Sequence, residues 1–226
     1  MVATAVRDRP DLVERCLGSV GDSGLSDFDF WAWLDPLDRE VGADRLRAWG
    51  ADVVVLSYRV SDDLPPKHRV HLMRRDAAHR ARTGDYDRLL YLDSDVVLSR
   101  DFGREFERLW PEVEAHGCGA LAMGSYAGYE AKRLVERVPG IGAYVCTHGL
   151  GACLAFPVPG DLKAVESADV APTQSWDTHF SRVVAGSRVL TSAVSYASHA
   201  GAGTGMSATA HPGLEFDNLA PDLRRG

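Results

Sequence analysis

The sequence predicts an α/β protein with a mainly parallel β-sheet and helices on both of its faces. In the first 124 residues, short apolar runs alternate with segments whose apolar residues recur at helical spacing. Such an alternation is typical of parallel strands joined by crossover helices. Hydrophobic residues make up 45% of the 226 residues and charged residues 25%, the balance of a globular domain with a sizeable core.

The expected elements of this first part follow one another without a linker. The strands are predicted at 2–6, 28–34, 53–56, 89–92 and 120–123, and the helices at 10–20, 43–49, 70–81 and 102–113. Pro10 suits the first turn of its helix. The β-branched run at 53–56 predicts a strand buried on both faces. The helix at 70–81 is expected to expose an arginine-rich side.

After residue 124 the alternation loosens. We expect a helix at 131–138, a strand at 150–156, a helix at 175–185, a strand at 189–196 and then a glycine-rich loop. Neither an internal repeat nor a linker is visible, so residues 1–226 are expected to form one domain.

Charge and cysteine usage exclude several classes of protein. The formal net charge of −7 argues against a nucleic-acid binder. The four cysteines are too sparse for a disulfide framework, and Cys146, His148 and Cys153 match no common zinc spacing. The chain opens with no signal-peptide pattern and has no 18-residue apolar stretch, so we expect a cytoplasmic protein, with peripheral membrane contact left open.

Three Asp-x-Asp strings occur, and their positions distinguish them. Asp27/Asp29 and Asp85/Asp87 flank the entries of predicted strands, whereas Asp93/Asp95 directly follows one. Ligands of open α/β sheets bind beyond the carboxyl ends of the strands, which is where Asp93 and Asp95 are expected. Two carboxylates there suit Mg²⁺ or Mn²⁺, which can bridge a diphosphate. The alternative is a solvated turn.

Three stretches resemble glycosyltransferases with the GT-A fold, in particular the broad family-2-like group. They are YLDSDVVLSRDF, VATAVRDRPDLVERCLGSV and HRVHLMRRDAAHRARTGDYDRLLYLDSD. The resemblance covers residues 1–105 well and the rest loosely. It implies a Rossmann-like nucleotide-diphospho-sugar transferase domain, with a nucleotide-sugar-binding half at 1–124 and an acceptor-binding half at 125–226.

The resemblance also implies roles for individual residues. The nucleotide and its diphosphate would be bound by Thr4, Ala5, Arg7, Asp35, Arg74, Arg75, Asp93 and Ser94. The metal, Mn²⁺ or Mg²⁺, would be held by Asp93, Asp95 and His199. At Asp35 the sequence lacks the family's usual double-Asp-Gly-Ser pattern. For His199 a purely structural role is the alternative, and His148, His179 and His211 are competing histidines.

Asp177 is the candidate general base. The string Ser175-Trp176-Asp177-Thr178 opens a predicted helix and resembles the family's Glu-Asp or Trp-Asp motif. There Asp177 would take the proton of the acceptor hydroxyl. The alternative is a carboxylate that merely stabilises the positive end of the helix dipole.

The sequence thus predicts a metal-dependent glycosyltransferase that moves a sugar from a nucleotide-diphosphate-sugar to a saccharide or other hydroxyl acceptor, with inversion. The closest rival is a sugar nucleotidyltransferase, but the loop after the first strand, Arg7-Asp8-Arg9-Pro10, lacks that class's glycine-rich character. A haloacid-dehalogenase-type phosphatase would carry its Asp-x-Asp after the first strand. A non-catalytic sugar- or nucleotide-binding protein on the same fold is the remaining alternative.

Overall fold

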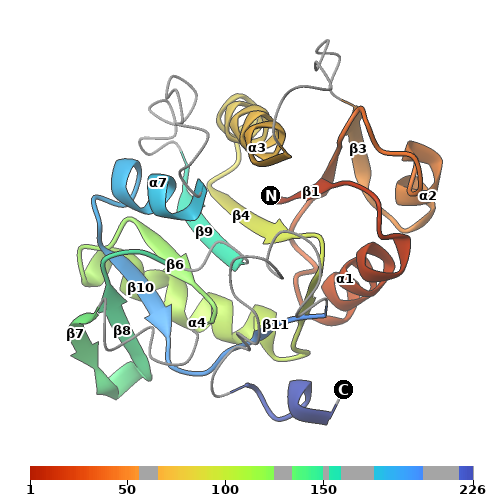
Figure 1. The fold of residues 1–226 in the computed structure, drawn as a ribbon. Helices are drawn as coiled ribbons and strands as arrows, with labels where there is room; N and C mark the ends of the chain where they lie inside the picture. The colour runs from red at the N-terminus through yellow and green to blue at the C-terminus, as the bar shows by residue number, and fades with distance from the viewer. Residues whose placement is uncertain (56–65, 125–133, 150–152, 159–175, 201–218, 226) are drawn as a thin grey trace.

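The computed structural model describes residues 1–55, 66–124, 134–149, 153–158, 176–200 and 219–225 (Figure 1). Its strands are β1 (Val2–Val6), β2 (Phe30–Leu34), β3 (Asp52–Val55), β4 (Arg88–Asp93), β5 (Val96–Leu98), β6 (Ala120–Ala122), β7 (Leu134–Val138), β8 (Ala143–Cys146), β9 (Cys153–Pro157), β10 (Val189–Ser192) and β11 (Ala197–His199). Its helices are α1 (Pro10–Asp22), α2 (Ala43–Ala48), α3 (Pro66–Thr83), α4 (Phe102–Ala115), α7 (Trp176–Val183) and the 3₁₀ turns η1 (Pro139–Ile141) and η2 (Leu223–Arg225).

Nine strands form one sheet in the order β3-β2-β1-β4-β9-β6-β10-β8-β7. The first four strands pair in parallel. Beyond them β9 runs antiparallel between β4 and β6, β10 is parallel to β6, and β8 is antiparallel to both β10 and β7. Seven of the nine strands therefore point the same way, and the predicted α/β class with a mostly parallel sheet is confirmed.

Helices cover both faces of the sheet (Figure 1). The side chains of β4 alternate between them: Leu90 and Leu92 pack in the core with α1 and α4, whereas Leu89 and Tyr91 pack with α3 and α7. This alternation follows from the two-residue period of a strand. A strand buried on both faces reads as a continuous apolar run, as β4 does.

Several expectations about individual elements are wrong. Residues 134–138 form strand β7 instead of a helix, because they pair with β8 and complete the edge of the sheet; residues 131–133 lie outside the described part. Strand β3 is the opposite edge, so it is half-exposed and not buried on both faces. The short strands β5 and β8 were not expected. None of the described helices is long and apolar enough to cross a membrane.

A close backbone contact joins α4 to the loop after α1. A Cβ atom on Gly103 would lie 2.4 Å from the carbonyl oxygen of Gly24 and 2.9 Å from that of Ser23. The amide of Gly103 donates a hydrogen bond of 2.7 Å to the Ser23 oxygen. A glycine is therefore required at this position by space, not by an unusual φ angle.

Candidate active site

The acidic motif lies where the sequence predicts it, at the carboxyl end of β4. Asp93 is the last residue of that strand, and Ser94 and Asp95 form the turn into β5. Asp29 and Asp87 each directly precede their strands and so lie at the opposite edge of the sheet. Asp29 accepts a hydrogen bond of 2.7 Å from the Tyr86 hydroxyl. The prediction that Asp93/Asp95, and neither of the other two Asp-x-Asp strings, lies at the carboxyl ends of the strands is confirmed.

Asp93 faces α3. Its Oδ1 accepts a hydrogen bond of 2.5 Å from Nη2 of Arg74, whose side chain is 3% exposed. The side chain of Asp93 itself is 32% exposed. Arg74 therefore neutralises Asp93 from the buried side and leaves part of the carboxylate accessible.

Asp95 has a different environment. Its Oδ2 accepts a hydrogen bond of 3.1 Å from Nη1 of Arg9, in the β1–α1 loop, and its Oδ1 lies 3.6 Å from Nδ1 of His199. His199 arrives there because β11 pairs antiparallel with β5, in a register that places His199 opposite Val96. The pairing of β11 with β5 thus places the imidazole of His199 beside the acidic motif.

The charges of Asp95 and His199 stabilise each other. Burial alone would raise the pKa of Asp95, but the interaction with His199 and the charge of Arg9 outweigh it and hold that pKa below its usual value. Burial would lower the pKa of His199, but the neighbouring Asp95 and Asp93 carboxylates raise it above its usual value. Each of the two groups therefore favours the charged form of the other.

The donor set suits a hard divalent cation. Two carboxylates and one imidazole are ligands that Mn²⁺ and Mg²⁺ accept. In the described residues, however, no three such side chains stand close enough to form a ready coordination cluster. Arg9 and Arg74 contact the carboxylates instead. The residues fit a metal chemically, and the carboxylates would exchange cationic partners to bind it.

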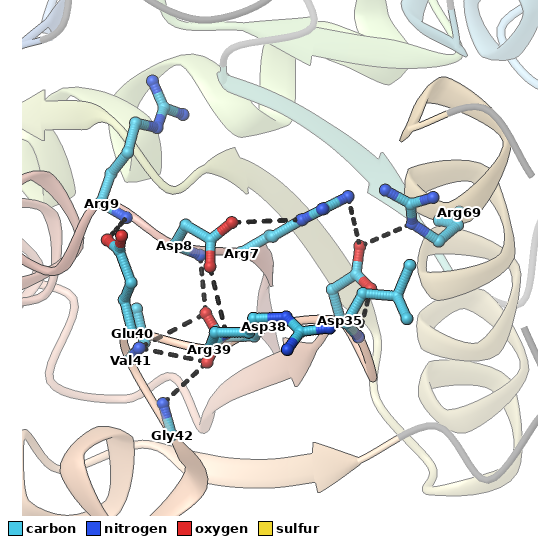
Figure 2. A network of polar contacts seen from close by, with 11 residues as sticks. Arg7, Asp8, Arg9, Asp35, Asp38, Arg39, Glu40, Val41, Gly42 and Arg69 are labelled. Carbon is cyan, nitrogen blue, oxygen red and sulfur yellow. Dashed lines mark hydrogen bonds and ion pairs between the residues drawn. The ribbon is translucent and has the colours of Figure 1, made fainter. Parts of the chain in front are cut away.

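A second charged cluster lies at the ends of β1 and β2 (Figure 2). Asp35 directly follows β2; its Oδ2 accepts a hydrogen bond of 2.8 Å from Nε of Arg69 and lies 3.8 Å from Nη1 of Arg7. The side chains of Asp35 and Arg69 are 2% and 3% exposed. A buried carboxylate so paired is fixed in place, which suits a residue that must present an oxygen in one direction.

The β1–α1 loop is tied to the β2–α2 loop. The backbone N–H groups of Asp8 and Gly42 donate hydrogen bonds of 2.6 Å and 2.9 Å to Asp38, and the N–H of Arg9 donates one of 3.2 Å to Glu40 (Figure 2). Asp8 and Arg9 have left-handed backbones, with φ of 51° and 55°. Such strain persists only where the surroundings impose it. The network therefore fixes the point from which the Arg9 side chain reaches Asp95.

The structure also gives the positions of the remaining residues that were predicted to bind the nucleotide. Thr4 and Ala5 lie in β1, and the crevice that they form with Arg74 and Tyr91 is too narrow for a water molecule. Ser94 is buried within the motif. Arg75 is half-buried on α3 and forms no ion pair with any described residue. A nucleotide would therefore lie over the strand ends rather than between β1 and α3.

Asp177 is the second residue of α7, as the sequence predicts, and Trp176 is the first. The ring of Trp176 covers the guanidinium of Arg74, with 3.5 Å between the Arg74 Cζ atom and the ring centroid. Since Arg74 also contacts Asp93, the start of α7 lies beside the acidic motif. Ser175 and His211 fall outside the described residues.

Comparison with solved structures identifies the architecture. Residues 1–349 of S. aureus TarS superpose with a TM-score of 0.53 at 12% identity, over 84% of this chain and 56% of that one. The mannosyltransferase PcManGT from Pyrobaculum calidifontis, in complex with GDP-Man and Mn²⁺, gives a TM-score of 0.53 at 11% identity, over 85% and 56%. The chain has the GT-A fold.

The same TarS fragment in complex with UDP-GlcNAc gives a TM-score of 0.54 at 11% identity, over 84% of this chain and 54% of that one. The chain thus spans little more than half the length of these GT-A proteins. No protein-family model and no curated protein sequence matches it. At such low identity the likeness establishes the GT-A fold and leaves the activity to be argued from the site.

Sequence reasoning missed three residues of this GT-A site. Arg9 and Arg69 pair with Asp95 and Asp35, and Trp176 covers Arg74. The expectation of an arginine-rich exposed side on the helix at 70–81 is wrong for Arg74, which is buried because it neutralises the Asp93 carboxylate. Arg69, just before the predicted start of that helix, is buried beside Asp35 in the same way. A signal existed, since both arginines face strands that end in aspartate, but helical periodicity treats every arginine as a surface residue.

Proposed function

We propose that the chain is a metal-dependent glycosyltransferase that uses a nucleotide-diphosphate-sugar donor. The observation that supports this most is the meeting of Asp93, Asp95 and His199 at the carboxyl end of β4, where two distant parts of the sequence supply two carboxylates and an imidazole. Ligands of open α/β sheets bind at this edge. The GT-A fold supports a nucleotide-sugar as the ligand class.

In this proposal the two charged clusters divide the donor between them. Asp35, which Arg69 and Arg7 contact, would bind the nucleobase by exchanging one of its present partners, because its side chain is 2% exposed. The acidic motif lies on the same edge of the sheet, at the end of β4, and β1 separates β4 from β2, which Asp35 follows. Mn²⁺ or Mg²⁺ bound by Asp93, Asp95 and His199 would supply positive charge to the diphosphate. Residues 1–124 thus bind the donor, and 125–226 the acceptor.

The proposed reaction is one in-line displacement. The acceptor hydroxyl oxygen forms a bond to the anomeric carbon while the bond from that carbon to the diphosphate oxygen breaks. The hydroxyl proton passes to the carboxylate of Asp177, and the nucleoside diphosphate leaves with the bonding electron pair. Attack from the face opposite the leaving group inverts the anomeric centre.

Calorimetry of nucleotide binding tests the proposal. We expect UDP or GDP to bind at least about tenfold more tightly with Mn²⁺ than with EDTA, since a hard cation bridges carboxylates and phosphates. Asp95→Asn should abolish this difference while the protein stays folded. Asp27→Asn, in an exposed Asp-x-Asp string at the other edge of the sheet, is the matched control. Equal affinity with Mn²⁺ and EDTA for the wild-type protein would contradict the proposal.

A further inference from the structure

A stacked pair of side chains joins α3 to the first residue of α7. The Arg74 Cζ atom lies 3.5 Å from the centroid of the Trp176 ring, while Nη2 of the same guanidinium donates to Asp93. A planar guanidinium can stack on an aromatic ring with its face and bind a carboxylate with its edge at once. Arg74 is 2% exposed, so both interactions take place out of water. One side chain therefore links Asp93 to the first residue of α7.

Tyr91, on β4, contacts both Arg74 and Trp176. Its hydroxyl donates a hydrogen bond of 2.6 Å to the carbonyl oxygen of Arg74, and its ring centroid lies 5.5 Å from that of Trp176. The Arg74 Cζ atom lies 5.1 Å from the Tyr91 ring centroid. Tyr91 precedes Asp93 by two residues on β4, so its side chain points to the same face of the sheet. The strand that carries the acidic motif thus fixes both members of the pair.

We propose that Arg74 is a positioning residue that sets the place of Asp177 relative to Asp93. Asp177 follows Trp176 directly, at the start of α7, so the stack that holds the Trp176 ring also restrains the adjoining backbone of Asp177. A side chain that mainly bound the diphosphate would be open to solvent in the absence of ligand, whereas Arg74 is enclosed by Trp176, Tyr91 and Asp93. This role rests on the proposed glycosyltransferase function.

The proposal predicts which kinetic constant changes. A displaced base slows the chemical step, and a misplacement of about 1 Å costs about 100-fold. Arg74→Lys keeps a positive charge opposite Asp93 but lacks the planar face that stacks on Trp176. We expect kcat to fall about 10- to 100-fold, and the Kd of UDP or GDP with Mn²⁺, measured by calorimetry, to change no more than about threefold.

Variants of the ring complete the test. Trp176→Leu should lower kcat as Arg74→Lys does, and the double variant should be no slower than the slower single one, because both remove the same contact. Trp176→Phe keeps an aromatic face and should recover part of kcat. Arg45→Lys is the matched control, because Arg45 on α2 also stacks on a tryptophan, with 5.0 Å between its Cζ atom and the Trp49 ring centroid, but takes no part in the proposed site.

The outcomes separate the two claims. A wild-type protein that turns over a donor, with Arg74→Lys at unchanged kcat, overturns the positioning role alone. A tenfold loss of UDP or GDP affinity in Arg74→Lys but not in Trp176→Leu also overturns it, since that pattern belongs to a direct diphosphate contact. A wild-type protein that neither binds nor turns over nucleotide-sugars with Mn²⁺ overturns the proposed function, and the positioning role with it.

Discussion

Removal of the imidazole of His71 should make the protein more resistant to mild acid. His71 on α3 and His179 on α7 are 4% and 5% exposed, with ring centroids 6.0 Å apart. Neither ring nitrogen of His71 has a hydrogen-bond partner in the described structure. Burial, and next the positive charge of Arg74, lower the pKa of His71 from 6.5 to about 4. The folded protein therefore keeps this ring neutral.

The sign and the size of the effect follow from that pKa. Below pH 6.5 the unfolded chain binds a proton that the folded chain refuses, so the contribution to stability is complete above pH 6.5 and is lost as the pH falls toward 4. The full loss is about 3 kcal/mol, of which about 2 kcal/mol is reached by pH 5. This is a large part of the 5–15 kcal/mol typical of a domain.

Urea denaturation at pH 7.5 and pH 5.0 measures this loss. We expect His71→Leu to lose about 2 kcal/mol less than the wild-type protein between the two pH values. His79→Gln, at an exposed position of the same helix, controls for the removal of a histidine from α3. If His71→Leu lost as much stability as the wild-type protein on acidification, the buried imidazole would not be the source of the acid sensitivity.

Three further predictions concern packing, the buried ion pair and the base. Gly103→Ala should lower the free energy of unfolding, measured by urea denaturation, by about 1–3 kcal/mol because the added Cβ atom meets backbone atoms. Gly18→Ala, with open space around it, should raise that free energy by about 0.5–1 kcal/mol. Equal effects of the two substitutions would refute the close contact at Gly103. Arg69→Met should cost about 3–5 kcal/mol because it removes the close cationic partner of the buried Asp35 carboxylate and leaves only Arg7 at 3.8 Å. A loss under about 1 kcal/mol is typical of a solvent-exposed ion pair and would contradict the burial of this one. Asp177→Asn should lower kcat about 10²- to 10⁴-fold with little change in KM. Asp11→Asn, which changes an aspartate in the first turn of α1, should leave kcat unchanged. Retention of configuration at the anomeric carbon, observed by NMR of the product, would exclude the mechanism.

The sequence was most informative where local pattern and tertiary structure agree. Strand β4 is buried on both faces and therefore reads as an apolar run, so the position of Asp93 at its carboxyl end was predicted correctly. The start of α1 was predictable because Pro10 fixes the backbone of a first helical turn. In both cases the physical cause lies within a few residues of the signal.

Pattern failed where distant partners decide the structure. Nothing in residues 134–138 states that β8 will pair with them, and edge strand β3 has the β-branched run of a central strand. The burial of Arg69 and Arg74 depends on aspartates that end two other strands. Charge pairs between elements have no sequence period, so the amphipathic pattern of residues 70–81 wrongly assigned Arg74 to the surface.

The order of strands in the sheet differs from their order in the chain, and this bears on how the protein folds. Strands β1 to β4 come from consecutive sequence and can pair early. Strand β9, which lies between β4 and β6, can pair with them only after all three segments have been synthesised. Pairing between distant segments slows folding. His199, on β11, reaches Asp95 later still. A nascent chain therefore carries the aspartates before it has the imidazole, and a ligand that needs all three side chains would stabilise only the completed molecule.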